Sequence, residues 1–233
     1  MNRASFLSST SVAAVAASAA GAVPGGSDFV ERSANFDAAA FARAVDKPAN
    51  IRQVWEAVAF RPALFNNMKN GLNGFHFGFG YPSDHITMVF APHGPASAFT
   101  YGDDVWSKYR IGEFLGVKDA AGKPVVSNVY LRPASAFEST NDPNDPQSFF
   151  QDVAIATLQS RGAVFLTCHT AVEEQARAIV KGGFAPSRMS ATDVADDILT
   201  HLIPGTHVVP AMVAAIAILQ QRYHYSYITL TFA

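Results

Sequence analysis

Hydrophobic residues gather along the chain in short runs that are separated by longer amphipathic segments. Residues 86–91 (ITMVFA) and 163–167 (AVFLT) form largely apolar runs, and further candidate strands occur at 207–209 and 225–232. Such runs are typical of parallel strands that are covered on both faces of a sheet. Residues 54–60 (VWEAVAF) fit either a first strand or the beginning of a helix.

Helical spacing of apolar residues recurs between these runs. Pro210 would occupy the first position of the last helix, where proline is accepted. Thr170 and Glu173 fit a capping box, with Thr170 as the N-cap of the helix that follows. The helices predicted in this way lie at about 37–45, from 61 toward the glycines that precede Tyr81, and at 96–109, 147–161, 171–181, 192–203 and 210–222.

Strands that alternate with helices predict an α/β fold. We expect a single three-layer domain over residues 51–233, with about five mostly parallel strands and helices on both faces. Residues 27–50 would form an N-terminal extension. Residues 111–146, with the turn-rich motifs GVKDAAGKP and NDPNDP, would form an irregular insertion that either covers a site or subunit contact or is a solvated excursion. The predicted core positions are Met88, Val89, Phe90, Val164, Phe165, Leu166, Val208, Val209, Ile216 and Ile228.

Residues 1–26 (MNRASFLSSTSVAAVAASAAGAVPGG) have the pattern of an export signal. Arg3 precedes an Ala-rich stretch without acidic residues, and small residues follow in A-x-A spacing at 17–19 and 20–22. Arg3 with Phe6 and Leu7 is similar to a twin-arginine signal in which Ala4 replaces the second arginine. We therefore expect a periplasmic or otherwise exported protein; the alternative is a disordered Ala/Ser tail.

The amino-acid composition argues against some classes of function. Apolar residues make up 49% of the chain, charged residues make up 15%, and the net charge is −2. No cluster of Lys and Arg forms a basic stripe, which argues against nucleic-acid binding. No run after the N-terminus is long and apolar enough to span a membrane.

Cys168 is the only cysteine of the chain and the main candidate for chemistry. It follows a predicted strand and precedes a helix, whose positive end favours a thiolate. We expect its pKa to lie modestly below that of an ordinary thiol. The alternative is a cysteine that simply packs in the core, as free cysteines often do.

Two histidines are candidate partners of this thiol. His93 lies in the APHGPA turn after the strand at 86–91. Because the carboxyl ends of parallel strands share one rim, His93 and Cys168 are expected on the same edge of the sheet. His169 is adjacent in sequence, and either imidazole would act as proton partner or thiolate stabiliser. Neither a zinc pattern nor a C-x-x-C-H haem motif is present, so we predict no metal site and no cofactor from these motifs. Non-covalent haem or copper stays open, since the chain has seven histidines.

Three segments carry a resemblance to a known family: VFAPHGPASAF, ATLQSRGAVFLTCHTAV and ILTHLIPGTHVVPAMVAAIAILQQRYHYSYI. Together they resemble the DsrE/DsrF-like sulfur-relay superfamily, in particular its small exported members. The resemblance implies a small α/β domain that forms a homotrimer or homohexamer. It also implies that Cys168 carries sulfane sulfur as a persulfide and exchanges it with a donor or acceptor protein.

A second function remains open from the sequence. The chain could bind a small ligand, a metal or haem, or a partner protein without turnover, with His76 and Tyr81 of the GFHFGFGY stretch and Thr170 in its site. The apolar carboxyl segment YHYSYITLTFA also bears on assembly. An open edge strand of this kind invites association, so we expect a neighbouring subunit or the insertion at 111–146 to cover it. The alternative is that the strand lies inside its own sheet.

Overall fold

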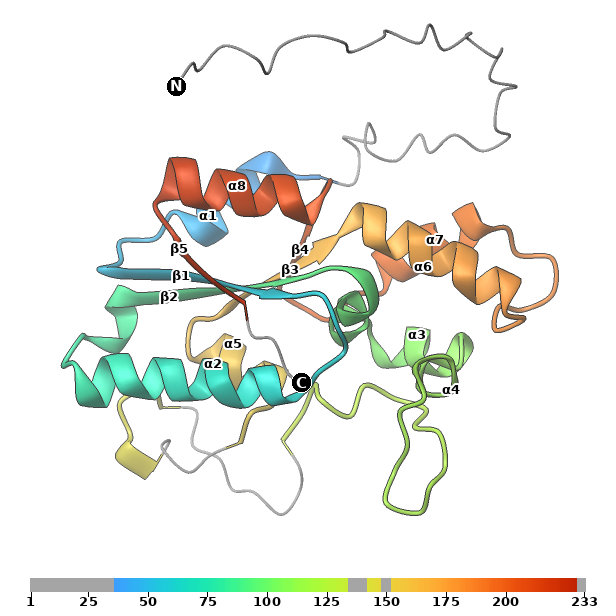
Figure 1. Ribbon diagram of the computed structural model, residues 1–233, viewed down its shortest axis with the longest axis horizontal. Coiled ribbons are helices and arrows are strands. Elements are labelled where there is room, and N and C mark those ends of the chain that lie inside the picture. The colour runs from blue at the N-terminus through green and yellow to red at the C-terminus, as the bar shows by residue number, and fades with distance from the viewer. Residues whose placement is uncertain (1–35, 134–141, 148–151, 230–233) are drawn as a thin grey trace, which may run out of the picture.

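The computed structural model describes residues 36–133, 142–147 and 152–229. Its five strands form one parallel sheet with the order β4-β3-β2-β1-β5 (Figure 1). The strands are β1 (Ile51–Ala57), β2 (Ile86–Pro92), β3 (Val164–Cys168), β4 (Thr206–Val209) and β5 (Ser226–Thr229). The predicted α/β class and the parallel pairing of the two apolar runs are confirmed, since Val89 lies opposite Val164 in the β2–β3 ladder.

Helices cover both faces of this sheet (Figure 1). One face carries α1 (Ala38–Val45) and α8 (Met212–Tyr223), and the other carries α2 (Ala63–Asn73) and α5 (Ile155–Ser160). Beyond the carboxyl ends of the central strands lie α3 (Asp103–Lys108), α4 (Ile111–Leu115), α6 (His169–Lys181) and α7 (Ala191–Thr200).

The central strand β2 shows why a continuous apolar run predicts a strand in the middle of the sheet. Met88 and Phe90 pack toward α2, whereas Val89 and Ala91 pack toward α8. Successive side chains of a strand point to opposite faces, so a strand covered on both sides is buried throughout; in β2 the only polar side chain is Thr87, which is buried as well. Among the predicted core positions, Val208 and Ile228 are only half-buried, because they lie on the edge strands β4 and β5.

An aromatic cluster fills the face covered by α2. Phe99 is fully buried, stacks on Phe60 with ring centroids 3.9 Å apart, and meets Phe65 edge-on at 4.8 Å. Phe99 belongs to a 3₁₀ segment, Gly94–Thr100, which occupies the first half of the helix predicted at 96–109. Only the second half of that range is α-helical, as α3.

Several predicted helix boundaries are wrong for identifiable reasons. The helix predicted at 147–161 begins only at Ile155, because the Asp152 carboxylate accepts hydrogen bonds from Ala154 N and Thr157 Oγ1 and holds the residues before the helix in a turn. Residues 148–151 lie outside the described part. The last helix begins at Met212, so Pro210 precedes it instead of opening it.

The described part of the predicted insertion packs against the domain. Asn128 Nδ2 donates hydrogen bonds to Phe99 O and Tyr101 O, both at 2.9 Å. Gly112 of α4 lies against Val125, and an isolated bridge between Lys118 and Pro124 closes the loop between them. Residues 134–141 lie outside the described part.

The two ends of the described chain also join the domain. From the predicted extension, α1 contributes Phe41 and Val45 to the core. The carboxyl segment forms β5, an edge strand that pairs only with β1, and therefore does not lie inside the sheet. The predicted export signal, residues 1–26, lies outside the described residues. No helix in the described ranges has the length and apolar character that a membrane span requires.

Candidate functional site

Cys168 is the last residue of β3 and the N-cap of α6. Its Sγ accepts one hydrogen bond from Ala171 N at 3.4 Å and another from Met212 N at 3.3 Å. Ala171 lies in the first turn of α6, and Met212 opens α8. The sulfur therefore lies where the amino ends of two helices converge.

Burial opposes ionisation of this thiol. The residue is only 4% exposed. Burial raises the pKa of the Cys168 thiol, and although the backbone N–H groups of Ala171, Met212 and Thr170 favour the thiolate, the net direction is upward. Our expectation of a modestly more acidic thiol is wrong, because the loss of solvent outweighs the helix ends.

The predicted capping box is also wrong. Cys168, and not Thr170, caps α6, while Thr170 Oγ1 donates a hydrogen bond to Pro210 O at 2.9 Å. Glu173 is buried and faces His169 Nδ1 at 3.8 Å and Arg177 Nη2 at 3.4 Å. A capping box does occur at the start of α7, between Ser190 and Asp193.

His93 follows β2 at the rim predicted for it, but it faces β1. Its Nε2 lies 2.9 Å from Glu56 Oε1, and its backbone N donates to Ala57 O. Tyr227 of β5 donates its hydroxyl hydrogen bond to the other oxygen of Glu56. The structure thus places His93 in a carboxylate–phenol network.

His169 opens α6 and is buried against Glu173. The hydrogen bonds to Sγ described above come from backbone N–H groups and not from an imidazole.

Tyr101 is a neighbour of the thiol that the sequence analysis missed. Its side chain is fully buried, and its hydroxyl has no hydrogen-bond partner among the described residues. Burial raises the pKa of Tyr101, and electrostatic interaction with Cys168 raises it further. A phenol that stays protonated therefore lies within electrostatic range of Sγ. Local sequence carries no signal for this neighbour, because the two residues belong to different segments.

The remaining predicted ligand residues lie apart from Cys168. His76 belongs to the π-helical turn Gly74–Gly78 at the end of α2, and its Nδ1 lies 2.7 Å from Tyr81 O, just beyond that turn. This imidazole therefore fastens a turn to the chain that follows it. In the described ranges, no three His, Cys, Asp or Glu side chains gather in a way that could hold a metal ion.

An apolar pocket of about 480 Å³ lies between α1 and α8. Phe41, Ile218 and Tyr223 line it together with Val209, the β4 residue that lies opposite Cys168 in the sheet. A volume of this size is in the range of small-molecule sites, which run from about 300 to 1,000 Å³. Such a pocket suits an apolar ligand.

Comparison with known proteins gave no relatives: a scan against protein-family models, a search of curated proteins and a search of solved structures each returned no match.

Proposed function

We propose that the chain accepts sulfane sulfur as a persulfide on Cys168. The observation that carries this proposal is the pair of backbone N–H groups, from Ala171 and Met212, that point at Sγ from two helix amino ends. Helix amino ends stabilise negative charge on a nearby sulfur. Tyr101 supports the proposal as a protonated hydroxyl that has no hydrogen-bond partner among the described residues and lies within electrostatic range of Sγ.

The transfer needs no external oxidant. After the thiol proton has passed to solvent, the Cys168 thiolate attacks the outer sulfur of thiosulfate and forms a new S–S bond. The S–S bond of thiosulfate breaks, and its electron pair leaves with sulfite. Charge and atoms balance, because one sulfur atom has moved from sulfite to the cysteine sulfur.

We expect wild-type protein incubated with thiosulfate or a polysulfide to gain about 32 Da, the mass of one sulfur atom, on Cys168. Burial raises the pKa of this thiol, so the thiolate is a minor species near neutral pH. The initial rate of the gain should therefore rise between about pH 7 and about pH 9. Intact-mass spectrometry of timed samples measures both the product and the rate.

Cys168→Ser is the site control and should remain unmodified under the same conditions. Because any exposed cysteine reacts with polysulfide, the informative comparison is between native protein and protein unfolded in urea. A functional site reacts at least as fast when folded. Strong protection of the folded thiol from every donor would overturn the proposal and leave Cys168 as a packing residue.

A second candidate function is binding without turnover, and the apolar pocket between α1 and α8 favours it. The raised pKa and near-complete burial of Cys168 agree with this alternative. The same native-against-unfolded comparison separates the two functions, since a binding protein has no use for a reactive thiol.

We also propose that the chain is exported through residues 1–26 and assembles as a homotrimer or homohexamer. Support for assembly comes from β5, whose Tyr227 is 42% exposed and whose outer edge has no partner strand in the described chain. Light scattering coupled to size exclusion should give a multiple of the 24.9 kDa chain mass. A stable species at the mass of one chain would contradict assembly.

A further inference from the structure

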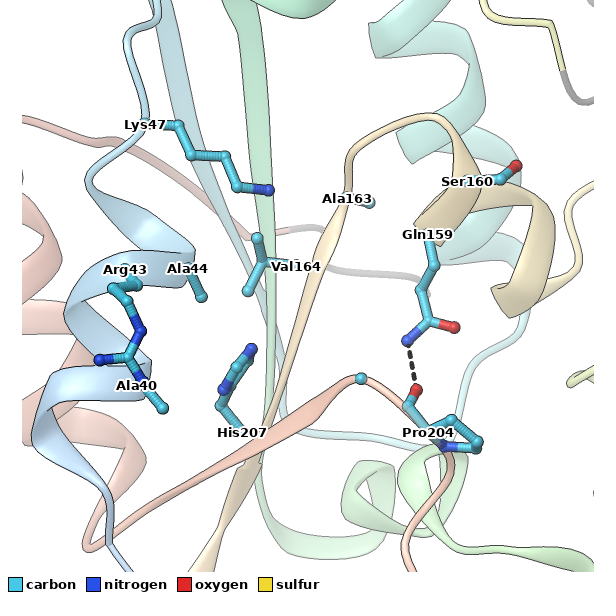
Figure 2. Close-up of a pocket in the computed structure, with 11 residues that line it drawn as sticks. Ala40, Arg43, Ala44, Lys47, Gln159, Ser160, Ala163, Val164, Pro204 and His207 are labelled. Carbon is cyan, nitrogen blue, oxygen red and sulfur yellow. Dashed lines mark hydrogen bonds between the residues drawn. The ribbon is translucent and has the colours of Figure 1, made fainter.

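A second pocket, of about 660 Å³, lies at the amino ends of β3 and β4 (Figure 2). This is the opposite end of β3 from Cys168. Helix α1 and the residue Lys47 beyond it form one side, where Arg43 and His207 also lie; Gln159 of α5 and Pro204 mark the other side.

Positive charge gathers on one side of this pocket. Arg43 lies in the last turn of α1, Lys47 follows that helix, and His207 lies on the neighbouring edge strand β4. Burial lowers the pKa of His207, and the positive charges of Lys47 and Arg43 lower it further, while Asp37 acts in the opposite direction. The imidazole therefore lies within electrostatic range of both cationic side chains.

These charges are not neutralised within the described residues. The side chains of Arg43, Lys47 and His207 form no hydrogen bond or ion pair there. The nearby acids have other contacts: Asp46 lies 3.4 Å from Arg52, and the Asp37 carboxylate accepts from Ala40 N. Neighbouring cations without a carboxylate partner are a common feature of oxyanion sites.

Two uncharged side chains of the pocket already donate hydrogen bonds within the protein. Gln159 Nε2 donates to Pro204 O at 2.9 Å, which ties α5 to the turn before β4 (Figure 2). Ser160 Oγ donates to Thr157 O at 2.8 Å. The charged groups are therefore the main attraction that this pocket offers to an anion, which favours a ligand with high negative charge.

We propose that this pocket binds a small organic phosphate. The phosphate group lies among Arg43, Lys47 and His207, where the arginine offers a planar fork and the lysine a mobile point charge. The volume exceeds that of a bare ion and falls in the small-molecule range of about 300–1,000 Å³. Ala44 and Val164 give the organic part an apolar wall.

Binding is tested on the full chain with inorganic phosphate, glycerol 3-phosphate and adenosine monophosphate as probes, at constant ionic strength. Calorimetry gives the affinities, and proton NMR follows the imidazole of His207. We expect saturable binding that raises the pKa of His207, with at least one organic phosphate binding more tightly than inorganic phosphate. Adenosine without its phosphate should bind at least about tenfold more weakly than the monophosphate.

The double variant Arg43→Gln, Lys47→Gln should lose at least about tenfold in affinity for the phosphates. Lys181→Gln is the matched control, because Lys181 is also an exposed cation in the last turn of a helix but does not line the pocket. It should bind like wild type.

Two results would overturn the proposal. One is a His207 titration that no phosphate shifts beyond the effect of sodium chloride at the same ionic strength, or a shift that persists in the double variant. The other is equal affinity for inorganic phosphate and both organic phosphates, which would show that the organic part of the ligand contributes nothing to binding. Both results are independent of sulfur chemistry at Cys168, because Cys168 lies at the other end of β3 and does not line this pocket.

Discussion

Phe99→Ala is expected to lower the free energy of unfolding by about 3–5 kcal/mol, the range for a buried phenylalanine. Phe99 has no exposed surface and contacts Phe60, Phe65 and Tyr130, with the stacked Phe60 ring at 3.9 Å. Truncation leaves a cavity. The three neighbouring rings belong to separate segments of the chain, so rotation of their side chains alone cannot fill it. Urea unfolding, followed by tryptophan fluorescence and by circular dichroism, measures the loss.

Phe79→Ala is the matched control. Phe79 is 76% exposed and has only a tilted contact with Phe75, at a ring distance of 6.3 Å. Its truncation should change stability by less than about 0.5 kcal/mol. If the two alanine variants unfold at similar urea concentrations, the aromatic cluster is not the centre of the core that its packing indicates.

Gly112→Ala should cost about 3 kcal/mol, at the upper end of the usual range for overpacking. A Cβ on Gly112 would lie 2.1 Å from Val125 O and 2.8 Å from Val125 N. Both are backbone atoms, so no side-chain rotation relieves the overlap. Either α4 or the loop that carries Val125 must shift, which would disturb the hydrogen bond from Val125 N to Val117 O. The midpoint of urea unfolding measures the effect.

Gly74→Ala provides the opposite case within the same chain. Gly74 has right-handed helical angles, φ −60° and ψ −46°, and a Cβ there would meet no atom within 4 Å. Alanine should therefore be neutral or stabilise the protein by about 0.4–1 kcal/mol through the unfolded chain. A loss for Gly74→Ala as large as that for Gly112→Ala would show that close backbone approach is not the cause.

The sequence predicted correctly the strands whose hydrophobic pattern is set by burial on both faces of the sheet. The runs at 86–91 and 163–167 predicted central parallel strands because such strands are buried on both faces and are therefore largely apolar, and both occupy the interior of the sheet. The first residues of the helices were harder to predict, because several side chains can accept hydrogen bonds from the same backbone N–H groups. Asp152 delays α5, and Cys168 takes the capping position that Thr170 and Glu173 would fill on pattern alone.

The neighbourhood of Cys168 was predictable only in part. Its place at a strand end before a helix followed from local pattern. Its second hydrogen-bond donor, Met212, and its phenolic neighbour, Tyr101, come from other segments, so no local spacing reveals them. The upward direction of its pKa is likewise a property of the packed interior, since burial by several segments sets it.

The strand order also constrains how the chain is built. β1 is among the first elements made, yet its outer neighbour β5 is synthesised last among the strands, and Ser226 meets Arg52 across 174 positions of sequence. Until then, one edge of β1 remains an unpaired template on the nascent chain. Contacts of such long range form slowly and leave intermediates open to association. Tyr225, whose hydroxyl donates to Val45 O at 2.7 Å, and Arg52, which donates to Tyr223 O at 3.0 Å, anchor this final segment to the start of the domain. During synthesis, then, the β1 edge stays open to pairing with other chains until β5 has been made.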